Sequence, residues 1–193
     1  MHEGFTLWFT GLSGSGKTTL AMAIERELRV RGTWHVQRLD GDVIREDLTR
    51  DLGFSKEDRD ENIRRVTFVA ELLSKNGVAT TCSFISPYRE ARATARERCY
   101  NFIEVYTECP LETLIERDPK GMYKKALAGE ITGFTGIDDP YEEPETPEIV
   151  VHTGQETVEE SANVILLYLE EKGFISESDL MPQEMVAASA TTR

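Results

Sequence analysis

The sequence lacks a long apolar run, is poor in cysteine and is short of positive charge. No stretch reaches the roughly 18 consecutive apolar residues of a membrane-spanning helix, and the first residues show no signal-peptide pattern. The cysteines Cys82, Cys99 and Cys109 are odd in number and have no metal-like spacing. We expect them to be buried or partly buried free thiols, which are typical of a reducing compartment. The sequence therefore predicts a cytoplasmic protein without membrane contacts.

The charge balance is acidic, with 22 lysines and arginines against 35 aspartates and glutamates and a formal net charge of −13. This balance argues against a nucleic-acid-binding surface. An acidic protein that binds anionic substrates must concentrate its positive charge in a cleft. About half of the clustered basic residues could instead lie on an ordinary solvated surface and have no role in binding. The basic clusters in the sequence are Arg59 with Arg64 and Arg65, Arg89 with Arg92, and Lys120 with Lys124 and Lys125.

Residues 11–18 read Gly-Leu-Ser-Gly-Ser-Gly-Lys-Thr and match the phosphate-binding loop pattern of glycine, four residues, then Gly-Lys-Ser/Thr. A buried strand is predicted before the loop and an amphipathic helix after it, which is the context that this pattern requires. The glycines let backbone N–H groups surround a phosphate, and the helix N-terminus adds partial positive charge. Lys17 is expected to reach the β- and γ-phosphates of ATP, and the Thr18 hydroxyl to bind Mg²⁺.

Strand and helix patterns alternate along the chain, which predicts an α/β fold. We expect a three-layer P-loop NTPase fold with a central, mostly parallel five-stranded sheet and helices on both faces. Strands are expected at 6–10, 35–39, 78–84, 102–107 and 148–152. Helices are expected at 17–31 and 43–51, from Ser55 to Gly77, at 87–99, from Pro110, and from Thr157 to Gly173. Residues 55–58 form a near capping box and residues 157–160 a full one, so caps are expected at Ser55 and Thr157.

Residues 118–147 interrupt this alternation, because glycines and prolines occur throughout the segment. Roughly 30 residues with little regular structure inside a compact domain usually form a lid or a binding loop, or are disordered. The aromatic residues Phe134 and Tyr141 argue against disorder. We expect a lid over 118–147 with one short helix at 123–127.

Polar residues follow the predicted strand at 35–39 and the one at 78–84, which is expected to be a central strand. Since ligands bind at the carboxyl ends of the strands in open parallel sheets, these residues are candidates for a site. Asp42 can orient an acceptor hydroxyl or the water shell of Mg²⁺, although it could instead cap the following helix. Asp40 is either a second carboxylate of the site or a turn residue. Ser86 could be a backbone or hydroxyl ligand, or equally a cap for the helix that begins at Pro87.

Two pairs of polar residues share helix faces near these strand ends. Arg45 lies three residues after Asp42, and Asn62 lies three residues after Arg59. Guanidinium groups suit anions and an amide suits a hydroxyl or a ring, so this set is typical of a phosphate-and-sugar substrate. Phe54 precedes the long helix and could instead be a hydrophobic staple for it.

With these residues, the chain resembles the adenylylsulfate (APS) kinase family over about residues 4–172. The phosphate loop is generic, whereas the string Phe-Ile-Ser-Pro at 84–87 and the lid strings are specific. One position differs, because Val43 stands where the family often has asparagine. The motifs that carry the resemblance are residues 9–19, 39–42 with Arg45, 53–55, 58–66, 84–88, 117–125 and 133–142.

The resemblance implies transfer of the γ-phosphate of ATP to the 3′-hydroxyl of adenylyl sulfate in sulfate assimilation, with Mg²⁺ as cofactor. The products would be 3′-phosphoadenylyl sulfate and ADP. It implies Lys17, Asp42 and Ser86 as catalytic candidates, and Thr18 and Asp42 as metal ligands. ATP is expected at Gly11, Ser13, Gly14, Ser15, Gly16, Lys17, Thr18, Thr19 and Arg117. Adenylyl sulfate is expected at Asp42, Val43, Ile44, Arg45, Phe54, Arg59, Asn62, Ile85, Ser86, Lys120, Gly133 and Phe134, with Phe54 and Phe134 on the two faces of the adenine.

The mechanism of phosphoryl transfer, the domain boundaries and the partners can be predicted as well. A route through a phosphorylated Ser86, described for some members of the family, is not required, because direct in-line transfer needs no covalent step. We expect a P-loop kinase domain at 1–175, a flexible tail or linker remnant at 176–193, a homodimer, and ATP sulfurylase as a functional partner.

Two alternative functions are another P-loop small-molecule kinase and a non-catalytic nucleotide-sensing domain. The Phe-Ile-Ser-Pro string argues against the first, and the presence of Lys17, Thr18 and Asp42 argues against the second.

Overall fold

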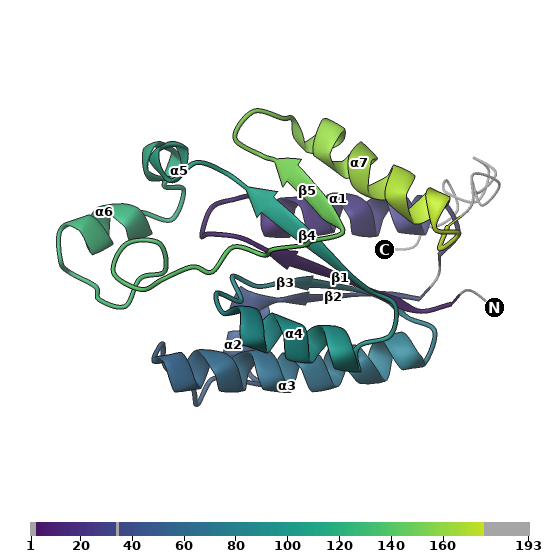
Figure 1. Ribbon diagram of the computed structural model, residues 1–193, viewed down its shortest axis with the longest axis horizontal. Helices are drawn as coiled ribbons and strands as arrows, with labels where there is room; N and C mark the ends of the chain where they lie inside the picture. The colour runs from purple at the N-terminus through teal and green to yellow at the C-terminus, as the bar shows by residue number, and fades with distance from the viewer. Residues whose placement is uncertain (1–2, 34, 176–193) are drawn as a thin grey trace, which may run out of the picture.

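The computed structural model describes residues 3–33 and 35–175, which form a sheet of five strands in the order β2-β3-β1-β4-β5 (Figure 1). All neighbouring strands are parallel, so the predicted sheet is confirmed and is wholly parallel. The central strand β1 is buried at all six positions. The strands are β1 (Phe5–Thr10), β2 (Val36–Asp40), β3 (Ala79–Ser83), β4 (Phe102–Glu108) and β5 (Ile149–His152).

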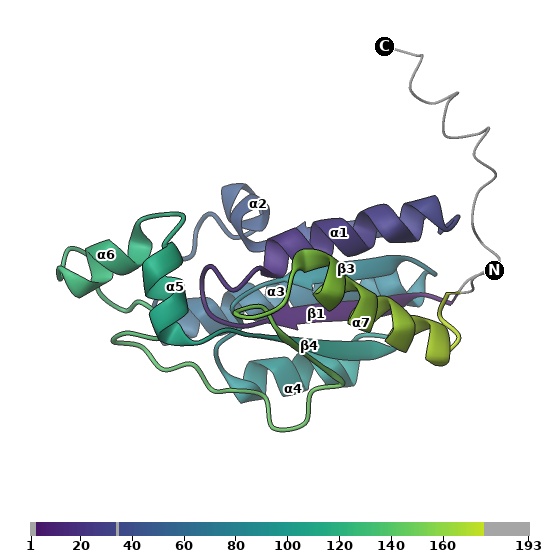
Figure 2. The ribbon, with the colours of Figure 1, turned by 90° about the horizontal axis from the view of Figure 1, so that it is seen from above.

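Helices cover both faces of the sheet, which confirms the three-layer arrangement. Figure 1 shows α1 (Lys17–Val30) and α7 (Val158–Glu171) on one face, and α3 (Lys56–Lys75) and α4 (Arg89–Arg98) on the other. Three short helices lie toward the end of the sheet to which the strands point, as Figure 2 shows from above. They are α2 (Gly41–Glu46), α5 (Leu111–Arg117) and α6 (Met122–Leu127).

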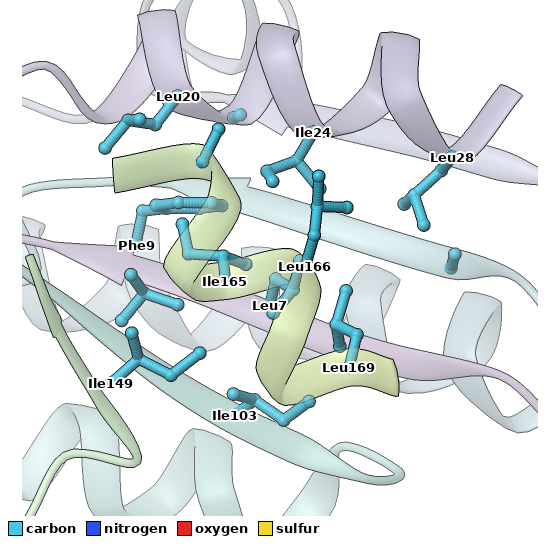
Figure 3. Packing of buried hydrophobic residues seen from close by; sticks show 14 of the residues in the cluster. Leu7, Phe9, Leu20, Ile24, Leu28, Ile103, Ile149, Ile165, Leu166 and Leu169 are labelled. Atoms are coloured by element: carbon cyan, nitrogen blue, oxygen red, sulfur yellow. The ribbon is translucent and has the colours of Figure 1, made fainter. Parts of the chain in front are cut away.

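A large part of the apolar core lies between the sheet and the helix pair α1 and α7. The spacing of three or four residues places the apolar side chains of each helix on one face. Every one of these side chains is at most 6% exposed, and burial of one such side chain stabilises the fold by about 1.5–3 kcal/mol. This packing fixes α1 directly behind the glycine loop. Figure 3 shows Leu20, Ile24 and Leu28 of α1, Ile165, Leu166 and Leu169 of α7, and Leu7 and Phe9 of β1.

The predicted caps at the starts of α3 and α7 are confirmed. The Ser55 side chain accepts a hydrogen bond from the Asp58 amide at 3.1 Å and starts α3. Thr157 and Glu160 form a complete capping box at the start of α7. Such caps stabilise a helix by about 1 kcal/mol, so the chain itself specifies where these helices begin.

The start of α2 differs from the prediction. Its N-cap is Asp40, whose carboxylate accepts a hydrogen bond from the Asp42 amide at 3.1 Å. The capping alternative for Asp42 is therefore wrong, and so is the reading of Asp40 as a mere turn residue. The helix ends at Glu46, well before the predicted 51.

Two further capping alternatives are wrong. Helix α4 begins at Arg89 with Tyr88 as its N-cap, so neither Ser86 nor the residue after it starts the helix. Phe54 is 67% exposed, and the residue that a staple would contact, one turn into α3, is the charged Arg59. Both Ser86 and Phe54 therefore need another explanation.

Residues 118–147 begin beyond the end of the sheet and then run back to the start of β5 (Figure 1), and α6 confirms the expected short helix. A small apolar cluster of Cys109, Leu114 and Tyr123, with Phe134 packed against it, joins this lid to the body of the domain. The Tyr123 hydroxyl donates to the carbonyl of Ser13 in the glycine loop at 2.9 Å. The lid is thus in contact with the phosphate loop.

No helix within 3–33 or 35–175 is long and apolar enough to cross a membrane. The three cysteines are buried and free, as expected. The predicted tail at 176–193 lies outside the described residues, and the domain boundary at 175 stays a prediction.

Candidate active site

The phosphate loop depends on a glycine and on two hydroxyl groups. Gly11 adopts φ +147°, and a Cβ there would lie 2.3 Å from the Thr107 hydroxyl oxygen, so a larger residue does not fit. The Ser15 hydroxyl is buried and pairs with the Thr107 hydroxyl of β4 at 2.7 Å. Gly11 and Ser15 therefore shape the loop from behind.

Lys17, the first residue of α1, is only 8% exposed. Its Nζ atom donates to the carbonyls of Gly11 at 2.9 Å and Leu12 at 2.7 Å. Burial, assisted by the positive charge of Lys120 and opposed by nearby carboxylates, lowers the pKa of Lys17 to about 7. A phosphate oxygen at this position would supply the negative charge that a buried ammonium needs.

Thr18 donates a hydrogen bond from its hydroxyl to the Asp40 carboxylate at 2.8 Å. Asp40 is 5% exposed, whereas Asp42, the predicted metal ligand, is largely exposed. Mg²⁺ prefers oxygen ligands and is usually bound by one or two carboxylates together with substrate phosphates and water. Thr18 and Asp40 fit that pattern, and the described residues contain no cluster of three acidic, histidine or cysteine side chains that would hold a metal alone.

One cavity of about 830 Å³ joins the phosphate loop to the lid, and this volume lies in the upper part of the range of ligand pockets. It brings together most of the residues that the sequence predicted for two separate ligands. From the ATP set, it is lined by Ser13, Gly14, Gly16, Lys17, Thr18 and Thr19. From the adenylyl sulfate set, it is lined by Asp42, Arg45, Phe54, Arg59, Asn62, Ile85, Ser86, Lys120, Gly133 and Phe134.

Besides Gly11 and Ser15, three predicted residues lie outside the cavity lining. Val43 is 59% exposed, and Ile44 packs against the core cluster around Trp8. Arg117 donates from Nη1 to the Thr153 carbonyl at 3.0 Å and so links α5 to the loop after β5. A role of Arg117 beside the ATP adenine stays a prediction.

The far end of the cavity carries an aromatic ring, a guanidinium group and an amide. The Arg45 guanidinium lies over the Phe54 ring at 4.5 Å from its centroid, and burial lowers the pKa of Arg45. Asn62 is 5% exposed, and its Oδ1 atom has no hydrogen-bond partner among the described residues. A buried acceptor without a partner in a cavity wall indicates a place for a ligand donor.

Two basic residues connect the lid to the body. Lys120 forms an ion pair with Asp42 at 2.6 Å, and both side chains are more than half exposed. Such a pair contributes at most about 1 kcal/mol, so a substrate can displace it. Arg59 is 8% exposed and donates to the Gly133 carbonyl and the Thr135 hydroxyl of the lid. Much of the hydrogen-bonding capacity of Arg59 thus serves the lid itself.

Ser86 adopts φ +41°, a left-handed conformation that is unfavourable by about 1–2 kcal/mol for a residue with a Cβ. Its hydroxyl is buried, accepts from Trp8 Nε1 at 3.1 Å and donates to Thr10 Oγ1 at 3.2 Å. The Ser86 proton and one lone pair are therefore both committed inside the fold. This arrangement gives the hydroxyl a structural role, although Ser86 lines the cavity.

Sequence reasoning missed Asp40 as a partner of Thr18, although its place at the end of a strand was a usable signal. It also missed the lid residues Ile131, Thr132 and Thr135, which line the cavity. No local pattern distinguishes these from other lid residues.

The family described as "Adenylylsulphate kinase" matches residues 3–152. The adenylyl-sulfate kinase of Halothermothrix orenii is 60% identical over 186 residues, covering 96% of this chain and 98% of that protein. A probable bifunctional SAT/APS kinase of Sorangium cellulosum is 56% identical over 90% of this chain, which spans 30% of that protein.

The solved structure of the Mycobacterium tuberculosis APS kinase in complex with AMPPNP and APS superposes with a TM-score of 0.84. It is 45% identical in sequence, and the match covers 88% of this chain and 99% of that one. The family matches most of the chain, and the sequence identity to the relative from Halothermothrix orenii is higher than a shared fold alone would give. The chain belongs to the adenylylsulfate kinase family.

Proposed function

We propose that the chain transfers the γ-phosphate of MgATP to the 3′-hydroxyl of adenylyl sulfate, which gives 3′-phosphoadenylyl sulfate and ADP. The observation that carries this proposal is the single cavity shared by the phosphate loop and the lid-covered acceptor residues. Family membership and a relative solved with both AMPPNP and APS support it. An in-line transfer needs donor and acceptor in one enclosed space, because its catalysis consists mainly of positioning and charge neutralisation.

Lys17 is proposed to neutralise the β- and γ-phosphates. It already lies in the loop with its ammonium on two carbonyls, and a phosphate oxygen would replace one of them. The bound Mg²⁺ would neutralise phosphate charge, with the Thr18 hydroxyl as a ligand and the Asp40 carboxylate beside it to bind the ion or its water shell.

Asp42 is proposed to orient the acceptor hydroxyl. It is exposed in the cavity and paired only weakly with Lys120, so its carboxylate is available once the substrate enters. Phe54 and Phe134 both line the cavity and are proposed to stack on the adenine. The unpartnered Oδ1 of Asn62 is proposed to accept a hydrogen bond from the substrate. Ser86 is proposed to contribute its backbone and not a covalent intermediate.

The test is an ADP-release assay with MgATP and one acceptor at a time. Adenylyl sulfate should give turnover, whereas AMP and gluconate should give little above the background of ATP hydrolysis. Absence of ADP release with adenylyl sulfate would refute the proposal. Efficient release with AMP or gluconate instead would favour another small-molecule kinase.

We further infer a homodimer, for which the exposed Phe68 and Leu72 on α3 offer apolar surface. Light scattering should give twice the chain mass of 21.8 kDa, and a monomer or a larger assembly would contradict this. ATP sulfurylase stays a proposed functional partner, supported by the relative whose name joins SAT and APS kinase. A cytoplasmic location is proposed on the three free, buried thiols.

A further inference from the structure

Arg92 of α4 contacts both a wall of the proposed acceptor site and the end of the lid. Its side chain is 3% exposed. Its Nη1 atom donates to the Ser86 carbonyl at 2.6 Å, and its Nη2 atom donates to the Glu142 carbonyl at 2.6 Å. Ser86 lines the cavity, and Glu142 belongs to the returning part of the lid. The guanidinium group of Arg92 therefore joins two segments that are far apart in the sequence.

The guanidinium is itself fixed to the sheet. Its Nε atom donates to the Glu104 carboxylate of β4 at 2.8 Å, and the Glu104 side chain is 8% exposed. Arginine meets its acceptors with N–H donors on three nitrogens of a rigid plane, whereas the three N–H donors of lysine all leave one nitrogen and cannot reach acceptors on different sides of such a plane. The ion pair with Glu104 thus sets the direction in which Arg92 meets Ser86 and Glu142.

The segments at Ser86 and at Glu142 both depend on contacts with other parts of the fold to keep their conformation. Ser86 has the left-handed φ of +41°, which persists only where surrounding contacts impose it. The lid end is joined to the same place through Tyr141, whose hydroxyl lies 2.9 Å from the Thr10 hydroxyl. Thr10 in turn donates to the Ile85 carbonyl at 2.8 Å and accepts from Ser86. The wall at 85–86 and the lid end at 141–142 are therefore parts of one hydrogen-bonded unit.

We propose that Arg92 is a positioning residue that keeps the acceptor-site wall at Ser86 in a fixed relation to the lid. It does not line the cavity, and it acts through the two carbonyls that it binds. Its loss would misplace the acceptor wall while the phosphate loop, which it does not touch, stays intact. The proposal rests on the proposed function, because it assigns the wall at Ser86 to the adenylyl sulfate site.

Arg92→Lys is the test, and Arg96→Lys is its matched control. Arg96 lies one turn later on α4 and also pairs with Glu104, at 3.2 Å, but its other partner is Glu148. Both variants keep the charge and an ion pair with Glu104. The readouts are KM for each substrate, kcat, and binding of adenylyl sulfate in the presence of ADP by calorimetry. Because the binding readout needs no turnover, an inactive wild-type protein would refute the proposed function and still leave Arg92 testable.

Arg92→Lys is expected to raise KM and Kd for adenylyl sulfate about 10- to 100-fold while KM for ATP changes less than about threefold. Arg96→Lys should change all three constants less than about threefold. Equal changes for both substrates, or equal effects of the two variants, would overturn the proposal. Should Arg92→Lys fail to fold, Tyr141→Phe decides, since it removes one hydroxyl of the same unit. A rise in KM for adenylyl sulfate alone supports the proposal, and unchanged constants refute it.

Discussion

Nucleotide binding is expected to bring a proton onto Lys17. In the free protein the pKa of Lys17 is lowered to about 7, mainly by burial, so the ammonium has lost its proton in part of the molecules at neutral pH. Phosphates that bind next to Nζ favour the charged form and raise this pKa again. Protons must therefore be taken up from the buffer when a nucleotide binds.

The magnitude follows from the pKa. With a free-state pKa of about 7, about 0.1 proton is taken up at pH 6, about 0.5 at pH 7 and about 0.9 at pH 8. The uptake grows with pH. As the pH rises through the lowered pKa, Lys17 loses its proton in the free protein, whereas the nucleotide complex keeps it. Beyond the ordinary lysine pKa near 10.5, the effect disappears again if the complex also loses the proton.

Isothermal titration calorimetry of AMPPNP with Mg²⁺, in two buffers with different ionisation enthalpies, measures the uptake directly. Lys17→Arg is the control, since a guanidinium remains protonated at every pH used. The nucleotide contributes its own protons equally to both proteins, so the difference between them reports Lys17. Equal uptake in the wild-type protein and in Lys17→Arg, or an uptake that does not grow with pH, would refute the reasoning.

Four further outcomes are expected. Lys17→Ala should lower kcat with adenylyl sulfate by about a thousandfold or more without unfolding the chain, and activity close to wild type would contradict the proposed charge neutralisation. Ser86→Ala should keep activity within about tenfold and lose about 1–2 kcal/mol of unfolding free energy, whereas complete loss of turnover in a folded variant would reopen the covalent route. Phe54→Ala should raise KM for adenylyl sulfate about tenfold, with Phe54→Trp close to wild type, and an unchanged KM in Phe54→Ala would exclude stacking. Thr157→Ala should lower the unfolding free energy by about 1 kcal/mol in urea denaturation at unchanged kcat, and an unchanged midpoint would contradict the capping box.

The sequence predicted those parts of the fold that depend on near neighbours. The glycine loop, the cap at Ser55 and the capping box at Thr157 are local patterns, and each appears where it was expected. The burial of β1 follows from its place before the loop motif, whereas the strand order was not predicted, because it depends on pairing between segments far apart in the sequence. Boundaries of short elements were less predictable, since α2 has no buried residue and ends at Glu46 and not at the predicted 51.

The site was predicted as a set of residues but not as a set of contacts. The basic cluster of Arg64 and Arg65 is an ordinary surface, where both residues pair with Glu61. Arg59 and Arg92 come from clusters that look the same in sequence, yet both are buried and join the lid to the body. The difference arises from partners more than 40 residues away, which no local spacing reveals.

The central place of β1 in the sheet also determines when this strand and the nucleotide loop after it can fold during synthesis of the chain. β1 is made before its neighbours β3 and β4, so its second edge stays open until Glu108 has emerged. Translation at about 5–20 residues per second makes that delay roughly 5–20 s. For this time a strand that is buried at every position in the native fold lacks at least one of its two neighbouring strands. The nucleotide loop at its end is accordingly translated before Thr107 of β4, whose hydroxyl pairs with Ser15 of the loop in the folded protein.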